Sequence, residues 1–589
     1  MDVLKKAWNY FRPYKRIMIL CYCLTVVVIF LNMVNPYVTK IIFDSVYKQG
    51  LGGMLLPLLG LMVGVTVLRH CIQYTKAYIL EYKTLEVIVD IRGELLRKFF
   101  KLSFETFNKA KTGDLLTVLT VDAENVKNIF ANTMPAIFES VFSFVVASVI
   151  LFSLSPLLTV LCYLTLPLVF FATRSYARQV RPIYVDVRAQ AARISTVAQE
   201  NINGVRIVRA FAREEFEKQK LDVENKKFTH INMKLVKVWA KMFWKMALLG
   251  NFPYLITLGA GSILTAQGVI SLGTLVAFTG YINYLMNPIN LISNYISMMQ
   301  NALVSGEKMF AFLEQEPSVQ NPEKGYIPAG FKGDISYNNV SLVYDGNEIL
   351  KDISLQIPFG SKVGVIGPTS SGKTSLVNLL PRFYDCTGGS LEIDGVDVRN
   401  YDLSFLRKQV SFVMQDVFLF SNTIDSNIAY NDSHIGEDKV VGAAKCACAN
   451  GFIVKMPQGY DTIVGERGIG LSGGQKQRIS MARAIIKPAP ILVLDDSTSA
   501  LDNETEQEIL HNIKNLERNC TLFVIASRIS SIKDADVILL LDHGRIAECG
   551  THDELMALGG QYAQIYNEQY GDNIREFIDD GLAAPCPTI

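Results

Sequence analysis

The chain has 589 residues, of which 50% are hydrophobic and 19% are charged. This length exceeds that of one domain, and the charged fraction is below the value of about 25% that is usual for soluble proteins. The net charge of +1 gives no indication of a nucleic-acid partner. The ten cysteines form no Cys-x-x-Cys pair, so we expect free thiols and no metal site among them.

The deficit of charge is local and predicts membrane-spanning helices. Asp, Glu, Lys and Arg are absent from residues 17–39, 51–68, 140–173 and 246–306. A spanning helix needs about 20 apolar residues, so each of the two longer runs can hold two helices. Pro156 interrupts one of these runs and Gln267-Gly268 the other, which gives six expected spans. The region after residue 325 has no such run and is typical of a soluble α/β domain.

Positive charge predicts how these spans are oriented. Five Lys and Arg residues precede the first run, and residues 83–127 between the second and third spans are also rich in them. Loops that carry such an excess face the cytoplasm. We therefore expect a multi-pass protein of the cell membrane with both termini in the cytoplasm.

Two segments between the expected spans carry a family resemblance. Residues 107–115 read Phe-Asn-Lys-Ala-Lys-Thr-Gly-Asp-Leu, and residues 200–214 run from Glu200 through Gly204 to Glu214. They resemble the two cytoplasmic loops of ATP-binding-cassette (ABC) exporters, which implies short helices that rest on nucleotide-binding domains and transmit their closure. The alternative is that both are amphipathic cytosolic helices without that role.

The last expected span has a polar face. Its members are spaced by four or three residues, which places them on one side of a helix; they are Asn283, Asn287, Asn290, Asn294, Ser297 and Asn301. Amides are costly against lipid, so this face must meet water or other helices. A lining of the substrate path and hydrogen bonding between helices both remain open. Arg69 and Glu139, in or beside apolar runs, are further candidates for cavity lining.

In the second half of the chain, a short apolar strand, Val363–Ile366, enters a phosphate loop. The loop fits the pattern G-x-x-x-x-G-K-[ST] and reads Gly367, Pro368, Thr369, Ser370, Ser371, Gly372, Lys373, Thr374, followed by Ser375. Its backbone N–H groups are expected to surround the phosphates of ATP, with Lys373 on the β- and γ-phosphates and the Thr374 hydroxyl on Mg²⁺. The ABC family commonly has Gly where Ser370 stands, so a positive φ there would strain the serine mildly.

Other matches to the ABC family follow in the family's order. The resemblance assigns Tyr344 to stacking on adenine, Gln415 to Mg²⁺ and the attacking water, and Asp495, which ends the apolar run Ile491–Leu494, to Mg²⁺. It also assigns Glu466 to sensing the partner's membrane domain and Asp502 to the dimer interface.

The segment Leu471, Ser472, Gly473, Gly474, Gln475 matches the family's signature motif. In the family, this helix start grips the γ-phosphate held by the opposite subunit. The resemblance therefore implies a dimer, with each ATP between two chains.

Two residues depart from the family pattern together. Asp496 stands where a glutamate normally orients water, and Ser527 stands where a histidine normally bridges that acid and the γ-phosphate. Misplacement by 1 Å can cost on the order of 10²-fold in rate. Because the groups that hold ground-state ATP are kept, we expect a site that binds ATP but hydrolyses it poorly, as in the degenerate-site subunit of bacterial heterodimeric exporters.

These features predict a six-helix exporter domain over 1–320, an α/β ABC ATPase domain over 325–570 and a mostly disordered tail over 571–589. The ATPase domain should contain a parallel sheet, an antiparallel β subdomain and a helical insert between Gln415 and the signature. The expected function is ATP-driven export of an amphipathic drug, lipid or peptide. The expected partner is a second exporter half that keeps a glutamate at the position of Asp496, which is the second acid of the family's Walker B motif. An ATP-gated membrane protein that does not pump and an active homodimer are the alternatives. A bacterial plasma membrane is the expected location.

Overall fold

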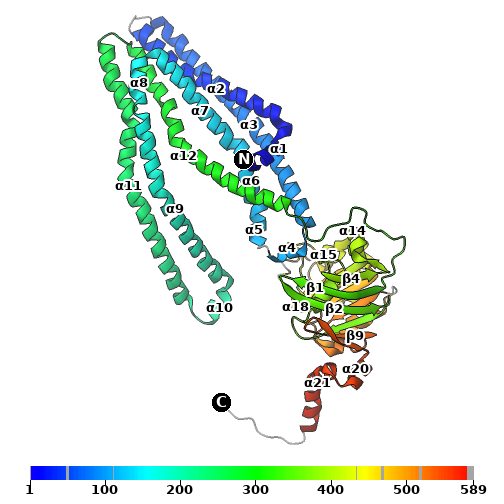
Figure 1. The fold of residues 1–589 in the computed structure, drawn as a ribbon. Coiled ribbons are helices and arrows are strands. Elements are labelled where there is room, and N and C mark those ends of the chain that lie inside the picture. The colour runs from blue at the N-terminus through cyan, green and yellow to red at the C-terminus, as the bar shows by residue number, and fades with distance from the viewer. Residues whose placement is uncertain are drawn as a thin grey trace. The chain divides into compact units, whose positions relative to one another are not determined.

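The structure is a computed structural model that describes residues 2–47, 52–109, 112–432, 434–465, 468, 470–516 and 520–579. It forms two compact units, which Figure 1 shows as a bundle of long helices and a mixed α/β domain. Unit 1 comprises Met1–Phe100 and Lys111–Gln315, and unit 2 comprises Lys101–Ala110 and Glu316–Ile589.

Unit 1 is helical throughout its described residues, apart from short connections. Its α-helices are α1 (Asp2–Phe11), α2 (Lys15–Ile41), α3 (Leu55–Lys101), α5 (Thr112–Thr117), α6 (Ala123–Asn128), α7 (Met134–Leu154), α8 (Pro156–Tyr163), α9 (Leu166–Asn203), α10 (Val205–Ala210), α11 (Glu214–Ala266) and α12 (Leu272–Glu314). Short 3₁₀ and π segments continue several of them.

Five stretches of unit 1 are long and apolar enough to cross a membrane. They are Asp2–Ser45, Gly52–Lys101, Thr112–Leu154, Pro156–Asn203 and Glu214–Ala266. The sixth expected span corresponds to α12, whose side chains are described only in part. Both expected interruptions are confirmed: Ser155 is extended before Pro156 opens α8, and Ser271 caps α12 by accepting a hydrogen bond from the Thr274 N–H group.

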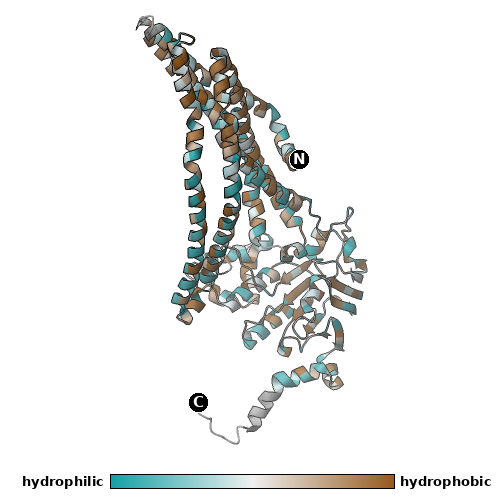
Figure 2. Cartoon of the chain, turned by 60° about the vertical axis from the view of Figure 1, so that its left-hand side comes forward, coloured by the Kyte–Doolittle hydropathy of each residue, from teal (hydrophilic) through white to brown (hydrophobic). Residues whose placement is uncertain are grey.

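A buried cluster holds the bundle together where α2, α7, α8 and α12 meet. Ile29, Leu151, Phe278 and Tyr281 are fully buried in it. Many other large apolar side chains point outward, as a bilayer requires, and Figure 2 shows hydrophobic residues along much of the long helices. α9 and α11 become more hydrophilic toward α10, where both are expected to leave the membrane.

Unit 2 contains two sheets. The antiparallel sheet has the order β2-β1-β4-β5, and the larger sheet has the order β10-β9-β3-β8-β7-β6, parallel except for the edge strand β10. The strands are β1 (Ile335–Tyr344), β2 (Asn347–Ile357), β3 (Lys362–Ile366), β4 (Gly388–Ile393), β5 (Val396–Asp397), β6 (Val410–Val413), β7 (Ile491–Asp495), β8 (Thr521–Ile525), β9 (Val537–Asp542) and β10 (Arg545–Gly550).

The α-helices of unit 2 surround these sheets. They are α4 (Phe104–Lys109), α13 (Lys373–Asn378), α14 (Leu403–Gln409), α15 (Ile424–Ile428), α16 (Glu437–Cys446), α17 (Asn450–Ile453), α18 (Gly473–Ile485), α19 (Asn503–Lys514), α20 (His552–Leu558) and α21 (Gln561–Asp579). The expected parallel sheet, antiparallel subdomain and helical insert (α15–α17) are all present. α21 continues over residues 571–579, where we expected a disordered tail, and residues 580–589 lie outside the described part.

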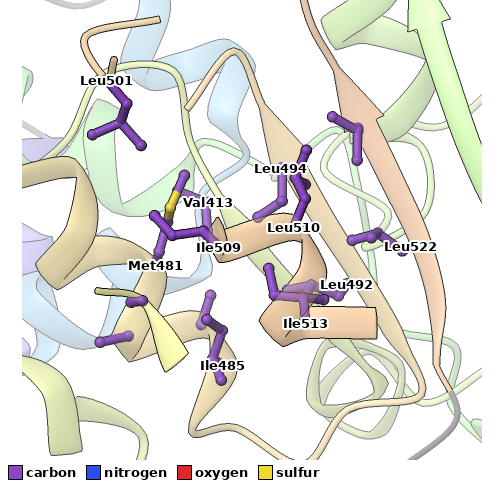
Figure 3. Packing of buried hydrophobic residues seen from close by; sticks show 14 of the residues in the cluster. Val413, Met481, Ile485, Leu492, Leu494, Leu501, Ile509, Leu510, Ile513 and Leu522 are labelled. Carbon is purple, nitrogen blue, oxygen red and sulfur yellow. The ribbon is translucent and has the colours of Figure 1, made fainter. Parts of the chain in front are cut away.

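The central strands are apolar because helices cover both faces of the parallel sheet. All five residues of β7 and of β8 are buried. Figure 3 shows one face, where Met481 and Ile485 of α18 and Ile509 of α19 pack with Leu492 and other apolar side chains of the sheet. This packing fixes the ends of β3, β7 and β8, from which the candidate site is built.

Candidate nucleotide site

The phosphate loop joins the end of β3 to the start of α13. Gly367 and Gly372 have φ values of 152° and 99°. A Cβ on Gly367 would lie 2.1 Å from the Leu541 carbonyl oxygen, and one on Gly372 would lie 2.9 Å from that of Ile349, so neither position has room for a side chain. Ser370 has a φ of 67°, which places it in the left-handed region that we expected to strain it.

A cavity of about 420 Å³ lies over this loop. The structure brings most of the predicted nucleotide residues to its wall: Gly367, Thr369, Ser370, Ser371, Gly372, Lys373, Thr374, Ser375, Gln415, Asp495, Asp496 and Ser527. Ile349 of β2 also lines it and was missed, because the sequence does not show which residue of β2 meets the loop. Pro368 is in the loop but not among the lining residues described.

Polar contacts connect the residues of the cavity. Lys373 Nζ donates to the carbonyl oxygens of Gly367 and Pro368 at 2.8 and 2.7 Å, which places its ammonium group inside the loop. The Thr374 hydroxyl donates to Asp495 Oδ1 at 3.0 Å. Gln415 Nε2 donates to Asp496 Oδ2 at 3.4 Å.

The electrostatics of the cavity suit a bound cation and phosphates. Burial raises the pKa of Asp495 to about 6, against the hydrogen bond from Thr374, and burial also raises the pKa of Asp496. Burial lowers the pKa of Lys373. Each shift shows that burial disfavours the ionised form of the group. A divalent cation would stabilise the two carboxylates, and phosphate oxygens would stabilise the ammonium group of Lys373.

The donor set fits Mg²⁺. Thr374, Asp495 and Gln415 offer a hydroxyl, a carboxylate and an amide oxygen, and Mg²⁺ prefers such oxygen ligands, usually one or two carboxylates completed by phosphates. In the described part of the chain, no group of three or more His, Cys, Asp or Glu residues offers an all-protein metal site.

Tyr344, the expected adenine contact, lies outside the cavity wall. It ends β1, and its ring meets Tyr384 edge to face, with the centroids 5.8 Å apart. Its stacking on adenine stays a prediction.

The signature motif lies at the start of α18, and its residues do not line the described cavity of their own chain. The Ser472 hydroxyl accepts from the Gln475 N–H group, and Gln475 Oε1 accepts from the Ser472 N–H group, which forms a capping box. A Cβ on Gly474 would lie 3.1 Å from the Ala500 carbonyl oxygen, so glycine allows the helix start to approach the segment after β7. Leu471 packs against the domain core and Ser472 is exposed.

The first part of the first predicted coupling loop belongs to unit 2, and its residues from 111 onward belong to unit 1. In α4, the Phe104 ring lies 4.2 Å from that of Phe383, and Asn108 Nδ2 donates to the Tyr384 hydroxyl at 3.0 Å. The second loop contains α10, where Ile207 is exposed, and Phe211 directly after this helix is exposed as well. Glu466 lies outside the described residues. Asp502 caps α19 by accepting from the Thr505 N–H group.

The polar face of α12 is partly placed. Asn283, Asn287, Asn294 and Asn301 are exposed, and the side chain of Asn290 lies outside the described part.

Asn283 and Asn287 line a hollow of about 430 Å³ within unit 1. Arg69, which also lines it, donates from Nη1 to Asn32 Oδ1 at 2.8 Å. Glu139, the other charged candidate, pairs with Lys76 at 3.3 Å and is not among the lining residues.

Comparison with known proteins identifies the family of this chain. Residues 18–289 match the ABC transporter transmembrane region, and residues 350–499 match the ABC transporter domain. The chain is 35% identical to the ABC transporter ATP-binding protein YknU of Bacillus subtilis (strain 168), over 97% of this chain and 98% of the relative. It is 33% identical to an ATP-dependent lipid A-core flippase of Desulfotalea psychrophila, over 96% and 99% of the two chains.

Among solved structures, a bacterial Atm1-family ABC exporter with ATP bound aligns with a TM-score of 0.78 and 27% identity. The alignment covers 94% of this chain and 98% of that one. The chain therefore belongs to the ABC transporter family, as an exporter that joins a transmembrane domain to an ATPase domain.

Proposed function

We propose that this chain is the ATP-retaining half of an asymmetric exporter for an amphipathic substrate. One observation carries the proposal: Asp496 and Ser527 line the same cavity as Lys373, Thr374 and Asp495. The two departures from the family pattern thus fall on the water-activating side of a site whose phosphate and metal ligands are kept.

The physical argument compares contacts to ATP in its ground state with contacts made in the transition state of hydrolysis. Contacts to phosphate and Mg²⁺ hold ATP in its ground state, whereas an acid that aligns water acts only in the transition state. A carboxylate must lie about 2.6–3.2 Å from the water that it activates. Asp496 is one methylene shorter than glutamate, and its Oδ2 is held by Gln415.

Two further features support a dimer. The start of α18 does not line the cavity of its own chain and carries an exposed serine, so it is available to a nucleotide held by another chain. In α10 and directly after it, Ile207 and Phe211 are 66% and 75% exposed, an apolar tip that a partner's ATPase domain would cover. We propose a different chain with an intact Walker B glutamate as that partner, and a homodimer is the alternative to be tested.

The substrate is proposed to be amphipathic, as it is for the lipid A-core flippases among the relatives. The hollow beside α12 combines Arg69 and several amides with aromatic and aliphatic side chains. Such a lining suits a molecule with a polar head and an apolar body. Drugs, lipids and peptides share that property.

The Lys373→Ala variant is expected to lose nucleotide occupancy of this chain's site, because the only cation among the described lining residues disappears from the loop. Photolabelling of the purified full-length chain by an ATP analogue should fall by at least about tenfold. Lys439→Ala, a change of an exposed lysine on α16, serves as the control. Unchanged labelling of the Lys373 variant would show that nucleotide binds elsewhere.

Cysteine labelling tests the substrate path. In a background without the ten native cysteines, Asn287→Cys should react with a membrane-impermeant maleimide, because Asn287 is exposed in the hollow. Leu285→Cys, two residues away on α12 but 1% exposed, should not react. Transported substrate should slow the labelling of Asn287→Cys. Equal reaction at both positions would contradict a water-accessible face.

A further inference from the structure

A single side chain of the C-terminal helix holds the loop that carries Ser527. Gln569 Nε2 donates to the Ser527 carbonyl oxygen at 2.9 Å, and the Ile529 N–H group donates to Gln569 Oε1 at 3.0 Å. One side-chain amide thus binds two backbone groups of the loop that follows β8, a carbonyl oxygen through its N–H and an N–H group through its oxygen. This pairing is specific, because only an amide of this length supplies both groups.

The helix that carries Gln569 is firmly attached to the domain. Tyr562 of α21 is fully buried, and its hydroxyl lies 2.8 Å from His552 Nδ1. Glu548 of β10 accepts from the N–H groups of Gln561 and Tyr562 at 2.5 and 3.2 Å. Gln569 follows Tyr562 by about two helical turns. Its amide is therefore presented from a fixed support, although the side chain itself is largely exposed.

The same loop is also hydrogen-bonded to α19 and to the segment before it. Gln507 Nε2 donates to the Ser530 carbonyl oxygen at 2.9 Å, and Arg528 Nη1 donates to the Leu501 carbonyl oxygen at 3.2 Å. These contacts fix the residues after Ser527. Gln569 acts on Ser527 itself, which lines the nucleotide cavity together with Ala526.

We propose that Gln569 is a positioning residue that sets Ser527 against the terminal phosphate of bound ATP, so that α21 tunes the affinity of the site for ATP. The inference rests on the nucleotide site proposed above. The loop Gly367–Gly372 is expected to hold phosphates that ATP and ADP share, whereas Ser527 lines the cavity together with Asp496 and Gln415, which are expected at the γ-phosphate. Loosening the Ser527 loop should therefore affect ATP and spare ADP.

The test compares two glutamines on one helix. Gln569→Ala removes both hydrogen bonds to the loop, and Gln564→Ala removes an exposed side chain from the preceding part of α21. The full-length chain, purified in the assembly that it forms, is titrated with Mg-ATP and with Mg-ADP well below its melting temperature. We expect Gln569→Ala to bind Mg-ATP about tenfold more weakly, as the loss of one or two net hydrogen bonds implies. Its affinity for Mg-ADP and both affinities of Gln564→Ala should stay at the wild-type values.

A second variant separates positioning from stability. Gln569→Glu keeps an acceptor for the Ile529 N–H group but sets a carboxylate oxygen against the Ser527 carbonyl, so it should weaken Mg-ATP at least as much as alanine does. Equal losses of ATP and ADP affinity would overturn the proposal, as would wild-type affinity in either Gln569 variant. If the wild-type chain itself bound no Mg-ATP, or if Lys373→Ala bound it normally, the nucleotide site would be wrong. Whether this site hydrolyses ATP does not enter the comparison.

Discussion

Replacing Ser472 by alanine is expected to lower steady-state ATP hydrolysis of the assembled transporter by about 100-fold, the usual cost of losing one donor to a developing anion. Asp496→Asn is expected to lower it by no more than about twofold, because that residue belongs to the site that we propose to contribute little turnover. The reason is that α18 of this chain is proposed to complete the partner's site. Changing the partner's Walker B glutamate to glutamine should therefore stop turnover almost completely.

Helix stability needs its own control in this experiment, since Ser472 caps α18 and loss of a cap costs about 1 kcal/mol. Thr551 caps α20 through a capping box of the same kind, away from the nucleotide cavity. Thr551→Ala should leave phosphate release near the wild-type rate. If Asp496→Asn abolished turnover as fully as Ser472→Ala does, or if this chain alone hydrolysed ATP at the rate of the full assembly, the asymmetric reading would fail and an active homodimer would take its place.

The double variant Asp496→Glu, Ser527→His is expected to create a hydrolytic site in this chain. The added methylene moves the carboxylate toward the cavity by about one bond length, and a 1 Å change in placement can be worth on the order of 10²-fold in rate. Histidine at 527 would supply a contact between that acid and the terminal phosphate. With the partner's own site silenced by its glutamate-to-glutamine change, turnover should rise by at least about tenfold over the same assembly with wild-type Asp496 and Ser527.

Asp416→Glu provides the matched control for this gain. Asp416 follows Gln415, is exposed and does not line the cavity, so the same chemical change there should give no gain. Each single change at 496 or 527 should recover less than the double variant, because the two groups act on one water. A double variant that binds Mg-ATP but hydrolyses no faster would show that the block lies elsewhere than in these two side chains.

Much of the nucleotide site could be predicted because its residues follow directly after strand ends. Gly367–Thr374 follow β3, Asp495 ends β7 and Asp496 follows it, and Ser527 comes two residues after β8. Carboxyl ends of parallel strands share one edge of a sheet, so the local patterns determined the spatial cluster. The two helix breaks near Pro156 and Gly268 could be predicted for a similar reason, because a few adjacent residues determine each of them.

Features that depend on long-range packing were not visible. Ile349 reaches the cavity only because β2 passes beside the loop, and Gln569 reaches Ser527 only because α21 folds back onto the domain. No local sequence pattern predicts either contact. The stretch 571–579 of α21 was not predicted as a helix, because it lies outside the family resemblance and was interpreted as part of a tail. Tyr344 was assigned by family order, and its contact with Tyr384 could not be foreseen from its own strand.

The close approach of α18 to the segment after β7 has a further consequence. The Ala500 N–H group donates to Gln477 Oε1, Gly474 leaves no space beside the Ala500 carbonyl, and Arg528 binds the carbonyl of Leu501. Direct contacts therefore connect three segments: the start of α18, the segment after Asp496 and the loop that carries Ser527. In the dimer that we propose, these segments would contact both nucleotides, one through the cavity and the other through Ser472. Even if this chain rarely hydrolysed its own ATP, the presence of that ATP would then affect the position of Ser472 at the opposite site.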